Sequence, residues 1–136
     1  MDVSKRLPLA LLALRVGVFI VFLGWTLDKL VVPTHAAIIY KKYYFMDDMV
    51  SAMFAVGVVE MVLILAFLAG YKKNWTYAIV LALHTLSTFA IFGKYFHLGT
   101  ELVYWASWPM LAAAFALYYL RDADTLLVID KPKSPA

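Results

Sequence analysis

Four long apolar stretches alternate with short polar segments along the chain. They cover residues 7–32, 46–69, 76–96 and 102–120. A helix needs about 20 mostly apolar residues to cross roughly 30 Å of hydrocarbon, so each stretch is long enough to span a membrane. Pro33, Gly70 and Gly99 follow the first three stretches, and both residue types commonly end helices. The pattern predicts an all-α integral membrane four-helix bundle that forms a single membrane domain over residues 1–136.

Three segments need separate interpretation. Residues 33–45 mix apolar side chains with two lysines and three tyrosines, which suits a short interfacial helix in the first outer loop. Residues 128–136 are rich in lysine and proline and are expected to form a flexible tail. Lys5 and Arg6 precede an apolar run, as in a signal peptide. That run is too long and is interrupted by Arg15, so we interpret it as a retained span.

The basic residues indicate the orientation of the bundle. Seven lie at the N-terminus, between the second and third spans, or after the fourth span: Lys5, Arg6, Lys72, Lys73, Arg121, Lys131 and Lys133. Four lie on the opposite side: Lys29, Lys41, Lys42 and Lys94. Because basic residues accumulate on the cytoplasmic side of membrane proteins, both termini are predicted to be cytoplasmic.

The composition excludes several other classes of protein. Apolar residues make up 65% of the chain and charged residues 15%, whereas average proteins have roughly 45–50% and 25%. A small soluble fold could not bury that much apolar surface, and a disordered chain would contain much less of it. The net charge of +3 is too small to suggest nucleic-acid binding. The absence of cysteine excludes disulfides, thiolate metal sites and a cysteine nucleophile.

Three ionisable residues lie well inside the predicted spans: Arg15, Glu60 and His84. Counting from the inner ends of the spans places all three roughly 12–17 Å deep, at about 1.5 Å per residue. A charge at such depth is costly and usually faces a partner. In one interpretation, Arg15 and Glu60 form an ion pair that fixes helix packing, and His84 is hydrogen-bonded nearby.

A second interpretation gives the same residues a function. Arg15, Glu60 and His84 are candidate catalytic residues, and with Trp25 and Trp108 they are candidates for a quinone-binding pocket in which His84 exchanges a proton. Haem ligation is disfavoured because no second histidine lies at the depth of His84. The polar residues of the outer side show no diagnostic ligand spacing, so no metal site is predicted.

Short motifs in the first two spans suggest a family. The first span reads LRVGV at residues 14–18 and FLGWTLDKL at residues 22–30, and the second reads GVVE at residues 57–60 before an apolar run. In these motifs the chain resembles the DoxX-like family of small four-helix membrane proteins. The family-pattern residues correspond here to Arg15, Asp28, Lys29, Gly57 and Glu60. The resemblance implies a four-helix bundle linked to membrane redox systems, of the DoxX/DoxD, thiosulfate:quinone oxidoreductase small-subunit type, in the prokaryotic inner (cytoplasmic) membrane.

One hypothesis is favoured and two alternatives stay open. The favoured one is a small accessory or anchor subunit of a larger membrane redox or respiratory complex, in contact with other membrane protein subunits and the lipid bilayer, and contributing to a quinone site. The first alternative is a quinone-interacting oxidoreductase subunit that uses Arg15, Glu60 and His84 for proton-coupled electron transfer. The second is an oligomeric transporter or channel, which the lack of an inverted repeat disfavours. No covalently bound cofactor is expected, and quinone and lipid are the candidate ligands.

Overall fold

The computed structural model describes residues 3–99 and 101–130, which form helices joined by turns. The elements follow in the order α1 Val3–Val31, α2 Pro33–Tyr44, α3 Val50–Leu68, α4 Lys73–Ala90, η1 Phe92–Phe96, η2 Leu102–Ala106 and α5 Ser107–Tyr119, where η marks a 3-10 helix. The described residues contain no strand, so the predicted all-α fold is confirmed. After α5, residues 120–130 fold back over one end of the molecule, and we call them the C-terminal segment.

The helices follow the predicted spans, with differences at their ends. α1 begins at Val3, earlier than the expected start at residue 7, and α3 begins at Val50, later than residue 46. The third stretch divides into α4 and η1, and the fourth into η2 and α5, so each contains a short 3-10 segment at the same end of the molecule. The short helix expected within residues 33–45 is present as α2.

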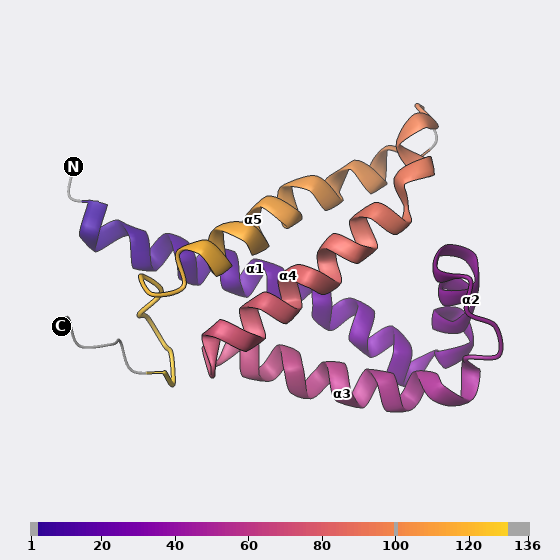
Figure 1. Cartoon of the computed structure of the whole chain (residues 1–136), viewed down its shortest axis with the longest axis horizontal. Helices are drawn as coiled ribbons and strands as arrows, with labels where there is room; N and C mark the ends of the chain where they lie inside the picture. Colours follow the sequence, from indigo (N-terminus) through magenta and orange to yellow (C-terminus); the bar gives the residue numbers. More distant parts are fainter. Residues whose placement is uncertain (1–2, 100, 131–136) are drawn as a thin grey trace.

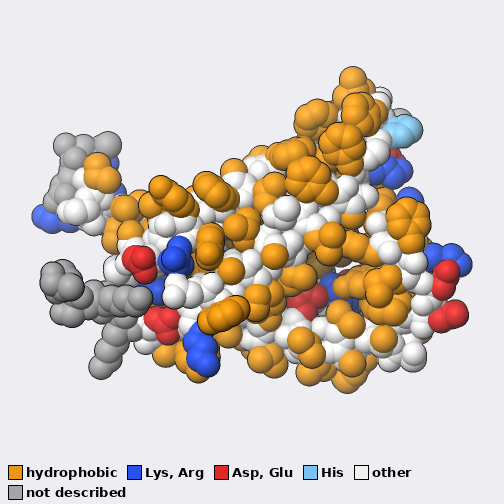
Figure 2. Space-filling view, viewed as in Figure 1, with side chains coloured by type: hydrophobic (Ala, Val, Ile, Leu, Met, Phe, Trp, Pro, Cys, Tyr) orange, Lys and Arg blue, Asp and Glu red, His pale blue; other side chains and the backbone are white. Residues whose placement is uncertain are grey.

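α1 and α3 are each long and apolar enough to cross a membrane. At 1.5 Å per residue, the 29 residues of α1 extend about 44 Å and the 19 residues of α3 about 29 Å, against a hydrocarbon core of roughly 30 Å. Without the adjoining 3-10 segments, α4 has 18 residues and α5 has 13. Large apolar side chains are exposed on all four of these helices. Figure 2 shows them across the visible face, with acidic and basic side chains mainly toward its two ends.

The helices form two pairs that diverge. α1 packs against α3, α2 and α5, and α4 packs against α5 and α3. In Figure 1 the α4–α5 pair rises away from α3 toward the end of the molecule where α2 lies. Two tyrosines of α2 connect the pairs there: the hydroxyl of Tyr44 lies 3.0 Å from Ser87 Oγ, and that of Tyr43 lies 3.2 Å from the hydroxyl of Tyr104.

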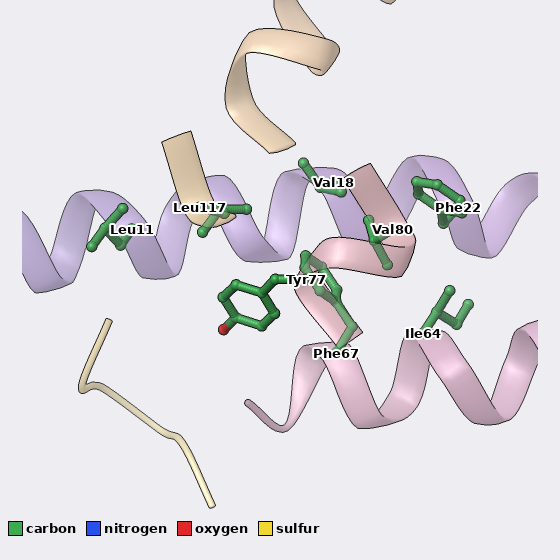
Figure 3. Packing of buried hydrophobic residues seen from close by; sticks show 8 residues of the cluster. All are labelled: Leu11, Val18, Phe22, Ile64, Phe67, Tyr77, Val80 and Leu117. Carbon is green, nitrogen blue, oxygen red and sulfur yellow. The ribbon is translucent and has the colours of Figure 1, made fainter. Parts of the chain in front are cut away.

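The core lies where α1 crosses the other helices. Every third or fourth residue of α1 is buried, which gives the stripe Leu11, Arg15, Val18, Phe22, Thr26 and Lys29. Apolar residues from three further helices pack against this stripe: Ile64, Phe67, Tyr77, Val80 and Leu117 (Figure 3). The stripe therefore carries two cations, Arg15 and Lys29, into the interior of a largely apolar molecule.

Candidate functional site

The buried charges of α1 belong to two separate groups. The first, which we call the Arg15 cluster, contains Arg15, Tyr77 and Asp124. The second is the Lys29–Glu60 pair, which joins α1 to α3. Each group is built from residues of different helices or segments, so its geometry depends on how those elements pack.

Arg15 binds the C-terminal segment from inside the core. Its side chain is fully buried, and Nη1 lies 3.1 Å from Asp124 Oδ2 and 3.2 Å from the hydroxyl of Tyr77. Tyr77 in turn donates a hydrogen bond of 2.7 Å to the same carboxylate oxygen, and Figure 3 shows its hydroxyl pointing toward the C-terminal segment. Nη2 donates to the backbone carbonyl oxygens of Leu126 and Leu127. Both terminal nitrogens of the guanidinium are thus occupied by contacts within the chain, whereas Nε is buried and has no hydrogen-bond partner among the described residues.

Asp130 and Lys73 extend this network to the start of α4. The Asp130 carboxylate accepts hydrogen bonds from the backbone N–H groups of Lys72 and Lys73 at 3.0 and 2.9 Å. It therefore caps the N-terminus of α4, where N–H groups lack helical partners. Lys73 Nζ donates to the carbonyl oxygens of Arg121 and Asp124 at 2.8 and 2.9 Å. The C-terminal segment is consequently held at several points along its length.

Gly70 makes close docking of the segment possible. It ends α3 with φ of +58°, and the N–H of Tyr71 bonds to the carbonyl of Ala66 at 2.9 Å, as in a Schellman motif. A Cβ atom at this glycine would lie 2.5 Å from Val128 Cγ1 and 2.9 Å from Arg15 Nη1. Only glycine fits between these two side chains in that backbone conformation.

The first residues of the expected tail, 128–130, make main-chain contacts with the rest of the chain. The N–H of Ile129 donates to the carbonyl of Ala69 at 2.9 Å, and that of Asp130 donates to the carbonyl of Gly70 at 3.2 Å. These main-chain hydrogen bonds attach residues 128–130 to the turn after α3. The remainder of the expected tail, residues 131–136, lies outside the described part of the chain.

The Lys29–Glu60 pair lies nearer to α2. Lys29 Nζ lies 2.9 Å from Glu60 Oε2, and the two side chains are 8% and 12% exposed. The same ammonium donates to the carbonyl of Trp25 at 3.2 Å and lies 5.9 Å from the centre of the Tyr40 ring on α2. Burial, followed by the charge of Glu60, raises the pKa of Tyr40 to about 12, which keeps this phenol protonated at physiological pH.

The expected ion pair between Arg15 and Glu60 is wrong. Arg15 and Lys29 are 14 residues apart on α1, or about 21 Å along the helix axis. α3 runs antiparallel to α1, which places Glu60 beside Lys29 and Gly70 beside Arg15. Arg15 therefore lies at the level of the turn after α3. Counting depth along each span separately missed this offset because it assumed that the spans begin at a common level.

The remaining candidate residues have their own partners. His84 Nε2 lies 3.0 Å from the carbonyl oxygen of Ser107, and its ring stands edge-on to Phe22 with centroids 6.2 Å apart. Trp25 is 51% exposed, and Trp108, 38% exposed, packs against aromatic residues of α4 and η1. The structure thus does not bring Arg15, Trp25, Glu60, His84 and Trp108 together around one described pocket.

Sequence reasoning missed the true partners, Lys29 and Asp124. A signal for Lys29 exists, because it continues the three-to-four-residue spacing of the buried stripe that contains Arg15. Asp124 carries no such signal, since it follows the last helix in a turn outside any periodic stretch. Its role depends entirely on how the C-terminal segment folds back.

Polar residues at the α2 end form local pairs. His35 Nδ1 lies 2.9 Å from Asp28, and Lys94 Nζ lies 2.7 Å from Glu101. The hydrogen bond from Lys94 lowers the pKa of the Glu101 carboxyl. Among residues 3–99 and 101–130, no three histidine, aspartate or glutamate side chains come together as a metal site would need.

Comparison of the chain with protein-family models, with curated proteins and with solved structures found no match in any of the three.

Proposed function

We propose that this chain is a small integral membrane subunit of a larger membrane redox or respiratory complex, in which it serves as an accessory or anchor component. The observation that carries this proposal is that the buried charged side chains pair with other parts of the same chain. Arg15 and Glu60 are engaged in contacts that join elements of the chain to one another, while the helix exteriors expose large apolar side chains. Such an arrangement suits a protein that packs among lipids and other subunits.

Four membrane crossings with cytoplasmic termini are part of this proposal. α1 and α3 provide two crossings. α4 with η1 and η2 with α5 provide the others, each as an α-helix extended by a 3-10 segment. The excess of basic residues on the side of Lys72 and Arg121 supports the cytoplasmic placement of that side. We place the protein in the prokaryotic inner membrane because of its resemblance to the DoxX-like family, which is also the reason for the redox assignment.

Topology can be tested with single cysteines, because the chain has none of its own. We expect Thr34→Cys to react with a membrane-impermeant maleimide in intact cells, and Thr125→Cys to react only after the membrane is opened. Both positions are exposed in the structure, so unequal labelling would report their location. Equal labelling of the two variants in intact cells would contradict the proposed topology.

Assembly can be tested by purifying the tagged chain in a mild detergent. We expect it to migrate on native gels in a complex much larger than its 15.4 kDa and to co-purify with subunits that carry redox cofactors. A chain that remains stable and runs alone, from membranes of cells that express its neighbours normally, would contradict the subunit proposal. Alkaline extraction of the membranes would separately test whether the chain is integral.

A second candidate function is quinone binding beside the Lys29–Glu60 pair. The specific observation in its favour is that Glu60 is 12% exposed, whereas Arg15 is fully buried. Under this proposal, Glu60→Gln lowers quinone-dependent turnover of the assembled complex, because an amide cannot accept a proton as a carboxylate does. Loss of assembly in this variant, together with unchanged specific turnover in the complexes that do form, would indicate a structural role instead.

A further inference from the structure

One side of α4 carries an open apolar groove that neither buried charge group uses. The groove has a volume of about 590 Å³, within the range of small-molecule sites. Most of its lining comes from α4, and the residues are Ala78, Leu81, Ala82, Leu86 and Phe89. Tyr118 of α5 completes it. The two alanines expose the floor of the groove between larger neighbours, which leaves room for a hydrocarbon chain.

The middle of the groove, on α4, offers one polar side chain, and its hydroxyl already has a partner. Thr85 also lines it, but its hydroxyl already donates to the carbonyl of Leu81 at 2.7 Å. At one end, the Phe89 ring stands edge-on to Trp108, with centroids 6.0 Å apart. The part of the groove formed by α4 therefore suits an apolar occupant, which would lose no hydrogen bonds on entering it.

The other end of the groove leads to a guanidinium. Asn74 lies one helical turn before Ala78 on the same side of α4, and its Oδ1 accepts a hydrogen bond from Arg121 Nε at 2.7 Å. Arg121 also lies over the Tyr118 ring, 4.7 Å from its centroid, and donates from Nη1 to the Tyr118 carbonyl at 2.8 Å. No described residue accepts a hydrogen bond from Nη2 of Arg121. This nitrogen can therefore donate a hydrogen bond to an anion.

We propose that this groove binds one acyl chain of an anionic phospholipid whose phosphate is held by Arg121. The length supports a lipid: from Ala78 to Phe89 the groove extends about 16 Å, close to half of the roughly 30 Å hydrocarbon core. The charge supports an anionic headgroup, since basic groups at the cytoplasmic ends of membrane helices bind such lipids. A partner helix would continue past Phe89 into the other leaflet. This inference rests on the membrane placement in the proposed function.

Native mass spectrometry of the detergent-purified full chain tests this site. Phosphatidylglycerol and phosphatidylcholine with identical acyl chains are titrated separately, and the affinity of the first bound lipid is compared. We expect the wild type to prefer phosphatidylglycerol about tenfold, as one charge-assisted contact would provide. Phosphatidylcholine carries the same phosphate but is zwitterionic, so Arg121→Gln should abolish the preference by weakening phosphatidylglycerol more than phosphatidylcholine. Lys42→Gln, which removes an exposed cation of α2, should leave the preference unchanged.

A groove variant completes the test. Ala82→Trp should weaken both lipids severalfold because the indole fills the space for the acyl chain, whereas Ala55→Trp on the exposed face of α3 should change neither. Full preference retained by Arg121→Gln, or unchanged affinities in Ala82→Trp, overturns the proposal. Loss of a protein partner in Ala82→Trp with unchanged lipid binding identifies a helix interface instead. If the chain is soluble after extraction without detergent, the membrane placement itself is wrong. If the chain needs detergent but shows no lipid preference, only this inference is wrong.

Discussion

Arg15 and Asp124 are 109 positions apart in the sequence and form an ion pair of 3.1 Å in which both side chains are fully buried. The pair ties the first helix to the segment that follows the last one. Tyr77 of α4 donates to the same carboxylate, so three parts of the chain meet at one oxygen atom. The residue that first suggested a catalytic role therefore holds the C-terminal segment against the bundle.

Replacing Asp124 by Asn should destabilise the protein strongly. The substitution leaves the Arg15 cation buried without its counter-charge, and breaking a buried pair in this way costs about 3–5 kcal/mol. Denaturation of the purified chain in detergent measures the change in unfolding free energy. The exposed neighbour Asp122→Asn is the matched control and should stay within about 0.5 kcal/mol of the wild type. Equal stability of the two variants would mean that the ion pair contributes little.

Gly70→Ala should also destabilise the fold, by interfering with the docking of the C-terminal segment. Its Cβ would lie 2.5 Å from Val128 Cγ1, in a backbone with φ of +58° that alanine disfavours. We expect the unfolding free energy to fall by about 1–3 kcal/mol. Limited proteolysis should also cut the C-terminal segment faster than in the wild type.

Gly17→Ala provides the control for the glycine substitution. Gly17 lies within α1, and a Cβ there would meet nothing within 4 Å. Alanine at this position should be neutral, or stabilising by up to about 1 kcal/mol. If both variants had the same stability, close packing at Gly70 would not be a requirement of the fold.

The Lys29–Glu60 pair should show strong coupling in a double-mutant cycle. Either Lys29→Met or Glu60→Leu alone leaves one buried charge unpaired, whereas the double variant removes both charges and should recover most of the lost stability. Measured unfolding free energies of the four proteins give the coupling. The more exposed Lys94–Glu101 pair, treated in the same way, should show much weaker coupling. Additive effects at the buried pair would disprove the interaction.

Gly57 allows α1 and α3 to approach closely, because it has no Cβ atom. A Cβ at this position would lie 2.8 Å from Leu30 Cδ2 and 3.1 Å from Lys29 Cβ. Overpacking costs about 1–3 kcal/mol and the higher helix propensity of alanine returns up to about 1 kcal/mol, so we expect Gly57→Ala to destabilise the protein by up to about 2 kcal/mol. Leu30→Ala removes the closer of the two neighbours, so the double variant should lose less stability than the sum of the single variants. If the stability losses of the two single variants simply add, the clash with Leu30 is not the cause of the destabilisation.

Helical order and apolar character could be predicted from local pattern alone. The helices α1, α3, α4 and α5 arise where the long apolar stretches were found, and α2 arises in the loop that was predicted to hold a short helix. These features depend on residues close together in the chain, because backbone hydrogen bonds within helices connect positions four residues apart. The three-to-four-residue spacing of the α1 stripe also places Arg15 and Lys29 on one buried face.

The pairing of the charges was decided by tertiary structure. Periodicity states which side of its helix Glu60 occupies, but the relative offset of α1 and α3 decides that its partner is Lys29 and not Arg15. That offset depends on side-chain packing at the helix crossing, including the close approach at Gly57. Asp124 belongs to no periodic stretch, and it reaches Arg15 only because the chain reverses after α5. The sequence by itself determined an apolar, helical protein with a buried arginine. Only the fold supplied its partner and buried Lys29 beside Glu60, since an ion pair requires two groups to meet in space.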